Sequence, residues 1–296
     1  MKIIIQSYST TGTRSSNEDA IDIVNNLDNS NISNIPILYI GVFDGHGGGD
    51  ISKTLVDKNK INIGKYFCNI SSPIASKLSI SKKFNNKMII PLFNRIQEKL
   101  KNYYIKSNTM GSTALIGLIY KYNSNQINQS DKFNLKIINL GDSRAIIYNE
   151  YNISNQLSLD HKPHLLCEKK RIDHMGGTLE YSEGDDPRIN GMSVSRSFGD
   201  LDNSFICQIP DIYDYIIRQD KFIILGCDGI WDVLQNQEVG DFILEKYDEL
   251  KSQNKNLVNL KANSENNLAQ KLADYAIEKG STDNISIIII FFVDNL

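Results

Sequence analysis

Acidic residues stand beside three apolar stretches of the chain, each in a turn with few bulky side chains. Asp44 follows the run 39–43, Asp228 follows the run 221–227, and Asp283 comes shortly before the run that starts at Ile285. Runs of this length, rich in β-branched and aromatic residues, predict buried strands. If the ends of these strands meet, the carboxylates share one small volume.

A further acid pair, Glu18 and Asp19, precedes a predicted short strand at 20–24 and follows the polar turn that carries Arg14. Two like charges about 4 Å apart repel by about 1 kcal/mol in water and by about 4 kcal/mol at an effective dielectric constant near 20. A cluster of such acids must therefore bind cations or take up protons. Ligands that are all oxygen favour Mg²⁺ or Mn²⁺ over zinc.

Each of these acids alone also fits a simple turn or cap, because Asp-Gly is common in turns. That interpretation needs the same coincidence at the ends of several buried strands, so the set as a whole favours a metal site. The glycines at 45 and 47–49 indicate a backbone that passes close to something small. Most glycine-rich turns are only turns, but this one also contains Asp44 and His46.

Two hard divalent ions can bridge a water molecule, lower its pKa towards neutrality and hold it in line with a phosphorus or carbonyl centre. Arg14 can hold a phosphate through two parallel hydrogen bonds beside the ions. His46 can protonate a leaving oxygen. This combination favours hydrolysis of a phosphate monoester. The residues alone leave nucleotides, sugars and phosphoproteins open as substrates.

The hydrophobic pattern predicts one α+β domain that covers residues 1–296, without internal repeats or a linker. Strands are predicted at 2–8, 20–24, 39–43, 112–122, 133–140, 145–148 and 221–227, and from residue 285 onwards. Helices are predicted near 51–56 and over 88–104, 163–175, 237–250 and 265–279. Loops are predicted at 25–34, 122–131 and 178–190, whereas 68–86 shows no clear pattern.

The composition is that of a soluble globular protein, with 41% hydrophobic and 23% charged residues in a chain of 296. A net charge of −3 gives no electrostatic reason to expect binding to nucleic acid or an anionic membrane. The four cysteines are scattered and favour a reducing compartment. No signal peptide or membrane span is predicted. We expect a monomer in the cytoplasm, with a nuclear location also open.

Several short motifs, taken in order, resemble the metal-dependent protein serine/threonine phosphatases of type 2C, the PPM family. The resemblance spans nearly the whole chain. Its motifs are Arg14 with Asn17-Glu18-Asp19, the run 42–48 (VFDGHGG), 111–114 (GSTA), 139–144 (NLGDSR), 160–163 (DHKP), 193–200 (SVSRSFGD), 227–232 (CDGIWD) and 282–286 (TDNIS).

This resemblance implies a fold of two antiparallel sheets packed as a β-sandwich and flanked by helix pairs, a four-layer αββα arrangement with a metal cleft at one end. Two Mn²⁺ or Mg²⁺ ions are implied, with Asp44 bridging them. Asp228 and Asp283 would complete one ion site. Glu18 and the backbone carbonyl of Gly45 would complete the other. A weaker third ion is implied at Asp142 and Asp228.

The resemblance also implies roles for the residues around the ions. Asp19 would orient metal-bound waters, Arg14 would bind the substrate phosphate, and His46 would protonate the leaving oxygen. The implied substrates are proteins that carry phosphoserine or phosphothreonine. Met110 departs from the small residue usual in the family, 201–209 is short, and 58–88 is not recognisable. Because these parts shape the mouth of the cleft, they leave substrate choice open.

Two other functions are compatible with the same motifs. One is a catalytically inactive scaffold that keeps the fold and binds a partner, although such proteins lose metal-binding acids. The other is a phosphohydrolase for small molecules, which would use the same metals. Among the remaining motif residues, we expect Arg196 and Asp200 to form a buried ion pair. We expect His161, His164, His174 and Trp231 to be packing or surface residues.

Overall fold

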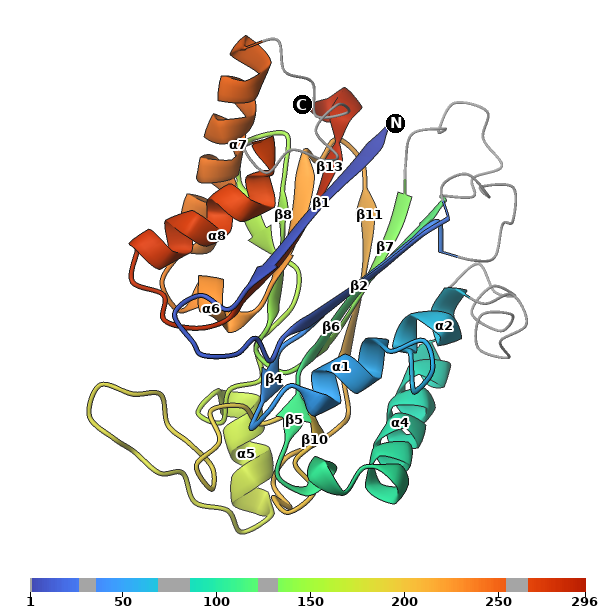
Figure 1. Cartoon of the computed structure of the whole chain (residues 1–296), viewed down its shortest axis with the longest axis vertical. Coiled ribbons are helices and arrows are strands. Elements are labelled where there is room, and N and C mark those ends of the chain that lie inside the picture. Colours follow the sequence, from blue (N-terminus) through green and yellow to red (C-terminus); the bar gives the residue numbers. More distant parts are fainter. Residues whose placement is uncertain (1, 27–35, 69–85, 122–132, 254–265) are drawn as a thin grey trace.

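The computed structural model describes residues 2–26, 36–68, 86–121, 133–253 and 266–296 (Figure 1). Two five-stranded antiparallel sheets face each other. The first has the order β1-β13-β12-β8-β9, with bounds Ile3–Thr10, Ile285–Phe292, Phe222–Gly226, Arg144–Tyr148 and Ser154–Gln156. The second has the order β11-β7-β6-β3-β2, with bounds Asp211–Ile217, Phe133–Leu140, Ala114–Lys121, Leu38–Phe43 and Ala20–Asn25.

Helices cover the outer face of each sheet, as Figure 1 shows. The second sheet packs against α1 (Asp50–Val56), α2 (Ile63–Cys68) and α4 (Ile89–Tyr103). The first sheet packs against α6 (Asp228–Trp231), α7 (Asn236–Ser252) and α8 (Leu268–Glu278). Helix α5 (Leu166–His174) lies apart from both groups. Short 3₁₀ turns occur at Asn86–Met88, Ile105–Asn108 and Val293–Asn295.

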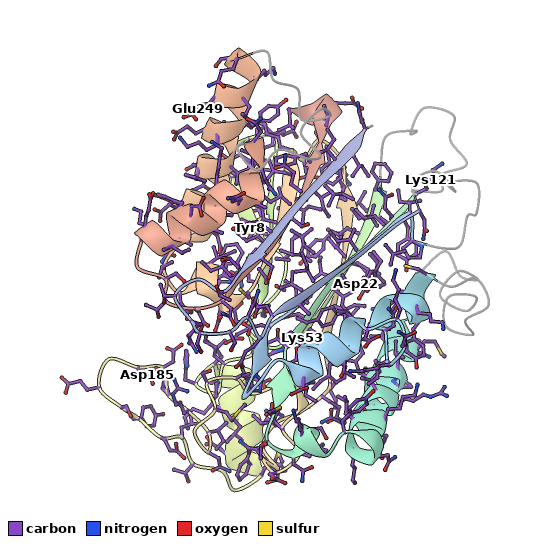
Figure 2. The ribbon with its side chains drawn as sticks, viewed as in Figure 1. Tyr8, Asp22, Lys53, Lys121, Asp185 and Glu249 are labelled. Atoms are coloured by element: carbon purple, nitrogen blue, oxygen red, sulfur yellow. The ribbon has the colours of Figure 1, made fainter. Side chains whose placement is uncertain are left out.

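The strand β13 shows why two layers of core form. All eight of its residues are buried, and it pairs with β1 on one side and with β12 on the other. Because successive side chains on a strand point to opposite faces, Ile287 and Ile289 pack towards the helices, whereas Ile288 and Ile290 pack between the sheets. Figure 2 shows the side chains that fill this space. A strand apolar on both faces is thus a central strand of a sandwich.

A small sheet with the order β10-β5-β4 closes one end of the sandwich. Its strands are only two residues long, Phe198–Gly199, Gly111–Ser112 and Gly45–His46. Strands β3 and β4 are separated by Asp44, and strands β5 and β6 are separated by Thr113. The chain therefore changes direction at Asp44 and Thr113, beside each other at the same end of the fold.

The predicted four-layer sandwich is confirmed, and most predicted strands and helices are present. The predicted strand 112–122 is interrupted at Thr113, whose N–H bonds to the carbonyl of Asp44 instead. The predicted helix 163–175 begins only at Leu166, because the chain first makes a turn in which the Leu165 N–H bonds to the Lys162 carbonyl.

The two longest elements that were not predicted are β11 and α2. Strand β11 is an edge strand on β7, and the apolar side chains at every second position, Tyr213, Tyr215 and Ile217, were a usable signal. Helix α2 has six residues, which is too short for a periodic pattern. The predicted loop 122–131, most of the loop 25–34 and most of the segment 68–86 lie outside the described residues. Among the described helices, none is both long and apolar enough to cross a bilayer.

Replacing Ile223 by Ala should destabilise the protein by about 2–5 kcal/mol, because the side chain is fully buried between the sheets and its loss leaves a cavity. The matched control is Ile216→Ala on the edge strand, where the side chain is 42% exposed. There we expect about 0.5 kcal/mol or less. Urea unfolding of both variants measures the difference, and equal losses would contradict the assigned core.

Candidate metal centre and active site

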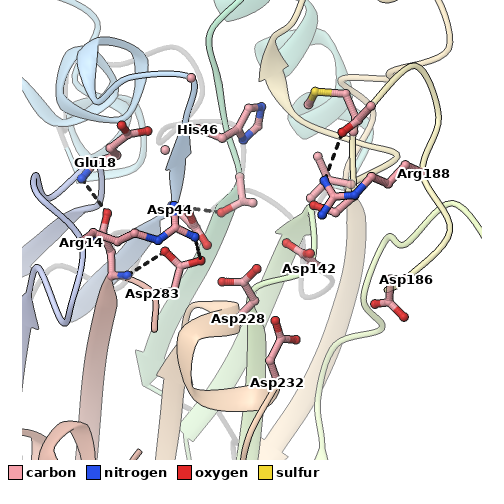
Figure 3. Close-up of a pocket in the computed structure, with 18 of the residues that line it drawn as sticks. Arg14, Glu18, Asp44, His46, Asp142, Asp186, Arg188, Asp228, Asp232 and Asp283 are labelled. Carbon is pink, nitrogen blue, oxygen red and sulfur yellow. Dashed lines mark hydrogen bonds and ion pairs between the residues drawn. The ribbon is translucent and has the colours of Figure 1, made fainter. Parts of the chain in front are cut away.

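A cleft opens at the end of the sandwich where the small sheet lies, and Figure 3 shows it with its lining side chains. The residues that line it come from turns at the strand ends of both large sheets, from the small sheet and from α6. All the predicted ion ligands, together with Arg14 and His46, line this one cleft, namely Arg14, Glu18, Asp44, Gly45, His46, Asp142, Asp228 and Asp283. Asp19, predicted to orient metal-bound waters, is buried and is not among the lining residues. The strand-end acids, more than 200 residues apart in some pairs, are thus brought together.

Asp44 is fixed through its backbone. Its N–H donates to Thr113 Oγ1 at 3.1 Å, and its carbonyl accepts from the Thr113 N–H at 2.8 Å. The hydroxyl of Thr113 is in turn 2.9 Å from Ser143 Oγ. This arrangement leaves the carboxylate of Asp44 free to face the cleft while its main chain is held on both sides.

The glycines after Asp44 allow two segments to approach closely. A Cβ atom on Gly45 would overlap the backbone oxygen of Glu18, so only glycine fits there. Gly47 and Gly48 have φ of +70° and +130°, and both pack against the segment that contains Met110. The Gly48 N–H donates to Glu18 Oε2 at 2.9 Å. The glycines are thus needed both for their backbone conformation and for the close approach of the neighbouring segments.

Arg14 lies at the rim of the cleft with a 58% exposed side chain. Its Nη2 is 2.8 Å from Asp283 Oδ2, and its Nε donates to the Thr282 carbonyl at 3.3 Å. Asn284 holds the turn around Arg14, because its side-chain amide donates to the carbonyls of Thr11 and Ser16 at 2.9 Å each. The guanidinium is therefore anchored beside a predicted metal ligand.

Asp142 stands in a turn that other motif residues stabilise. The Asn139 amide donates to the Gly141 carbonyl at 3.0 Å, and the Gly141 N–H donates to His161 Nδ1 at 3.0 Å. On the other side of the turn, Arg144 bonds both carboxylate oxygens of Asp160. His161 and Asp160 thus act as supports, and the prediction that His161 is a packing residue agrees with its 2% exposure.

His46 forms a contact that the sequence did not predict. Its Nε2 is 2.7 Å from Asp200 Oδ2. The expected ion pair between Arg196 and Asp200 is wrong. Arg196 instead bonds Glu168 on α5 and Asp211 at the start of β11. Its guanidinium can bond both carboxylates at once because it carries several N–H donors.

Burial and mutual repulsion raise the pKa values of the acids at the base of the cleft. Burial, followed by the charges of neighbouring acids, raises the pKa of Asp44 and of Asp142 well above the usual 3.8. The same causes raise the pKa of Asp228 to about 7. Burial raises the pKa of Asp19 to about 6. Concentrated negative charge in a dry site favours whichever cation can enter.

The donor set fits hard divalent ions. Both carboxylate oxygens of Asp19 and Oδ1 of Asp142 are buried and have no hydrogen-bond partner among the described residues. Such atoms are costly unless something positive approaches them. Cys227 lies within 4.8 Å of Asp19 and Asp44, but burial raises the pKa of its thiol. Its sulfur also bonds Asn284 O and Ser286 N–H, so it remains a protonated thiol rather than a ligand.

Further residues in and around the cleft were not predicted as site residues. Lys162 lies in the cleft wall, 2.7 Å from Asp186 and 3.3 Å from Asp232. Thr113 forms hydrogen bonds with the backbone of Asp44, and Asp200 forms one with the His46 ring. No local pattern marks these residues as a group, because each acts across a long stretch of sequence. Their only signal was membership of the motifs at 111–114, 160–163 and 193–200.

Comparison with known proteins places this geometry in a family. The sequence profile described as Protein phosphatase 2C matches residues 5–285. The PP2C-like domain-containing protein R307 of Acanthamoeba polyphaga mimivirus is 42% identical over 177 residues, which are 56% of this chain and 98% of that protein. Protein phosphatase 1L of Bos taurus is 32% identical over 252 residues, which are 82% of this chain and 63% of that protein. The chain therefore matches somewhat less than two thirds of the bovine protein.

A solved structure shares the fold. The crystal structure of a phosphatase from a pathogenic strain of Toxoplasma gondii aligns with a TM-score of 0.73 at 21% identity, covering 98% of this chain and 96% of that one. The profile match over nearly the whole chain, the bovine relative and the shared four-layer sandwich agree with one another. The chain belongs to the protein phosphatase 2C family.

Proposed function

We propose that this chain is a Mn²⁺- or Mg²⁺-dependent phosphatase that hydrolyses phosphoserine and phosphothreonine in proteins. One observation carries the proposal. The carboxylates of Asp44, Asp142 and Asp228, with pKa values raised by burial and mutual repulsion, meet in one cleft with Arg14 and His46 at its rim. Such a site combines cation binding with groups for phosphate and for proton transfer.

We assign the ion ligands as follows. Asp44 would contribute to both principal ion sites, joined by Asp228 and Asp283 at one and by Glu18 and the Gly45 carbonyl at the other. Asp142 with Asp228 would hold a weaker third ion. Unpartnered oxygens of Asp19 would accept hydrogen bonds from waters around the ions. When bound, the ions supply an activated water and neutralise the charge of the phosphate.

Arg14 would bind the substrate phosphate. Its side chain is exposed at the rim, yet Asp283 and the Thr282 carbonyl fix its direction. A planar guanidinium held in this way can donate parallel hydrogen bonds to two phosphate oxygens. Fixing the guanidinium in advance reduces the conformational entropy lost when the phosphate binds.

His46 would donate a proton to the serine or threonine oxygen as the bond to phosphorus breaks. Its side chain is 27% exposed and lines the cleft. An alkoxide is a poor leaving group, so the proton must arrive during bond cleavage. The oxygen donors of this cleft would suffice for a hard ion, which argues against His46 as a metal ligand.

A protein substrate is favoured over a small metabolite. The chain belongs to a family whose named members are protein phosphatases. The cleft also extends from the acid cluster to the loop that carries Asp185, Asp186 and Arg188, which gives an extended peptide a surface to contact. An inactive scaffold is disfavoured, because the complete set of predicted metal-binding acids lies in the cleft.

Activity should require a divalent ion and Asp228. The purified protein with Mn²⁺ should release phosphate from a phosphothreonine peptide, and EDTA should abolish this. Asp228→Asn should lower kcat/KM by about 10³-fold or more, because ion binding contributes several kcal/mol to stabilisation of the transition state. Asp248→Asn on the exposed face of α7 makes the same charge change and should leave kcat/KM unaltered. A Mn²⁺-loaded wild type without turnover would refute the proposed function.

His46→Ala should reduce turnover according to the leaving group. We expect a loss of about 10² to 10⁴-fold in kcat for a phosphoserine peptide, which is the usual contribution of general acid catalysis. The loss for p-nitrophenyl phosphate should be much smaller, since a nitrophenolate leaves readily without a proton. Steady-state kinetics of both substrates measure this, with exposed His174→Ala as the control. Equal losses on both substrates would remove His46 as the acid.

The metal-free protein should lose stability as the pH rises. The pKa of Asp228 is raised to about 7 and that of Asp19 to about 6, from 3.8. In this window the folded state binds more protons than the unfolded chain does, so stability falls until the pH passes the folded pKa values. In EDTA the protein should therefore melt at a lower temperature near pH 8 than near pH 5, and Mn²⁺ should offset the decline.

The variant Asp228→Asn tests the cause of this pH dependence. Removing one repelling charge should flatten the decline in EDTA and reduce the gain from Mn²⁺. Asp248→Asn should keep both effects. Thermal denaturation followed by circular dichroism measures them, and a metal-free wild type that melts at a higher temperature near pH 8 than near pH 5 would contradict the prediction.

A further inference from the structure

Asp200 makes the closest polar contact of His46 without itself reaching the cleft. Its Oδ2 lies 2.7 Å from Nε2 of His46 and also accepts the Ser197 hydroxyl. The carboxylate side chain is only 2% exposed, whereas the imidazole is 27% exposed and lines the cleft. Of the two residues, only the imidazole can contact a substrate.

The small sheet is built so that this pair can form. His46 on β4 and Gly199 on β10 both pair with Gly111 on the middle strand β5. A Cβ atom on Gly111 would overlap both the Asp200 carboxylate and His46 Nε2. The missing side chain in the middle strand therefore lets groups from the two outer strands meet across it.

The backbone around Asp200 is held in an uncommon conformation. Asp200 has a φ of +50°, and Gly199 before it has a φ of +81°. Gln97 on α4 clamps Gly199, accepting from its N–H and donating to its carbonyl at 2.9 Å each. The Asp200 N–H donates to the Met110 carbonyl at 3.1 Å. Such a conformation persists only where the surroundings enforce it, and it is often found at functional sites.

We infer that Asp200 is a positioning residue for proton transfer, holding the His46 imidazole by Nε2 so that Nδ1 delivers the proton to the leaving oxygen of the substrate. This inference rests on the proposed function. Among the described residues, Nδ1 of His46 has no hydrogen-bond partner, so it is the nitrogen left for a substrate. A buried carboxylate on one ring nitrogen fixes the orientation of the ring plane.

The proton balance of the step is simple. As the bond between phosphorus and the serine or threonine oxygen breaks, the Nδ1 proton of the imidazolium moves to that oxygen. The imidazole is left neutral and keeps its Nε2 proton, which remains hydrogen-bonded to Asp200. Asp200 exchanges no proton in this step, and the imidazole regains a proton from solvent in the open cleft.

The variant Asp200→Asn tests this role with little risk to the fold, because asparagine adopts positive φ readily. We expect kcat for a phosphoserine peptide to fall about 10²-fold, as small misplacements of a catalytic group typically cause. Turnover of p-nitrophenyl phosphate should change less than about threefold, since its leaving group hardly needs a proton. Asp202→Asn, an exposed site two residues further on, is the matched control and should behave like the wild type.

A double variant separates positioning from general support of the fold. If Asp200 acts through His46, then Asp200→Asn should cause no further loss of phosphoserine turnover in a His46→Ala background. A structural role would slow the His46→Ala variant further and would lower turnover of both substrates equally. Either of these results, or wild-type kinetics of Asp200→Asn on the peptide, would overturn the inference.

A spectroscopic measurement distinguishes failure of this inference from failure of the proposed function. In ¹H–¹⁵N spectra of the wild type, the His46 Nε2 proton should be protected from exchange, and Asp200→Asn should remove that protection. An enzyme without Mn²⁺-dependent turnover refutes the proposed function, and with it the positioning role, even if the protected proton is seen. An active enzyme whose Nε2 proton exchanges freely refutes the positioning role alone.

Discussion

Repulsion among carboxylates at one end of the sandwich is the constraint on which the rest of the structure depends. Burial brings Asp44, Asp142 and Asp228 together at the cost of raised pKa values. A carboxylate that must stay free for a cation cannot be fixed by its own hydrogen bonds. The supports act on the main chain instead, as Thr113 does for Asp44 and Asn139 for the turn of Asp142. Neighbouring residues hold the main chain of these acids in place, and the carboxylate oxygens remain available to a cation.

Much of the fold and the cleft was predictable, because the signals were local. An apolar run that ends in an acid indicates both a strand and the point where it ends. The positions of Asp44 and Asp228 at strand ends could therefore be predicted from the sequence. The contact of His46 with Asp200 could not be predicted, since strands two residues long carry no periodic pattern. Arg196 was paired with the wrong acid because sequence proximity was a poor guide. Its partners Glu168 and Asp211 come from a helix and an unpredicted strand.

Some of the motifs shared with the family supply residues to the cleft, and others hold elements of the fold together. Those around Glu18, Asp44, Asp228 and Asp283 bring oxygen donors to the cleft. Those around Asp160 and Arg196 instead join turns, α5 and β11 through partly buried ion pairs. Met110, a departure from the usual small residue, packs against the glycines after His46. Its bulk lies beside the His46 turn, and it is not among the residues that line the cleft.

The pairing of β1 with β13 has a consequence for how the protein is made. Among the described strands, β1 lies at the edge of its sheet and pairs with β13 alone, although almost the entire chain separates the two. Glu18 follows the first strand and Asp283 precedes the last, so the acid cluster closes only when these distant strands join. Contacts of such long sequence separation form late in folding. During synthesis, β1 cannot form this pairing until β13 has been made, and a chain that stops before residue 283 lacks one acid of the cluster.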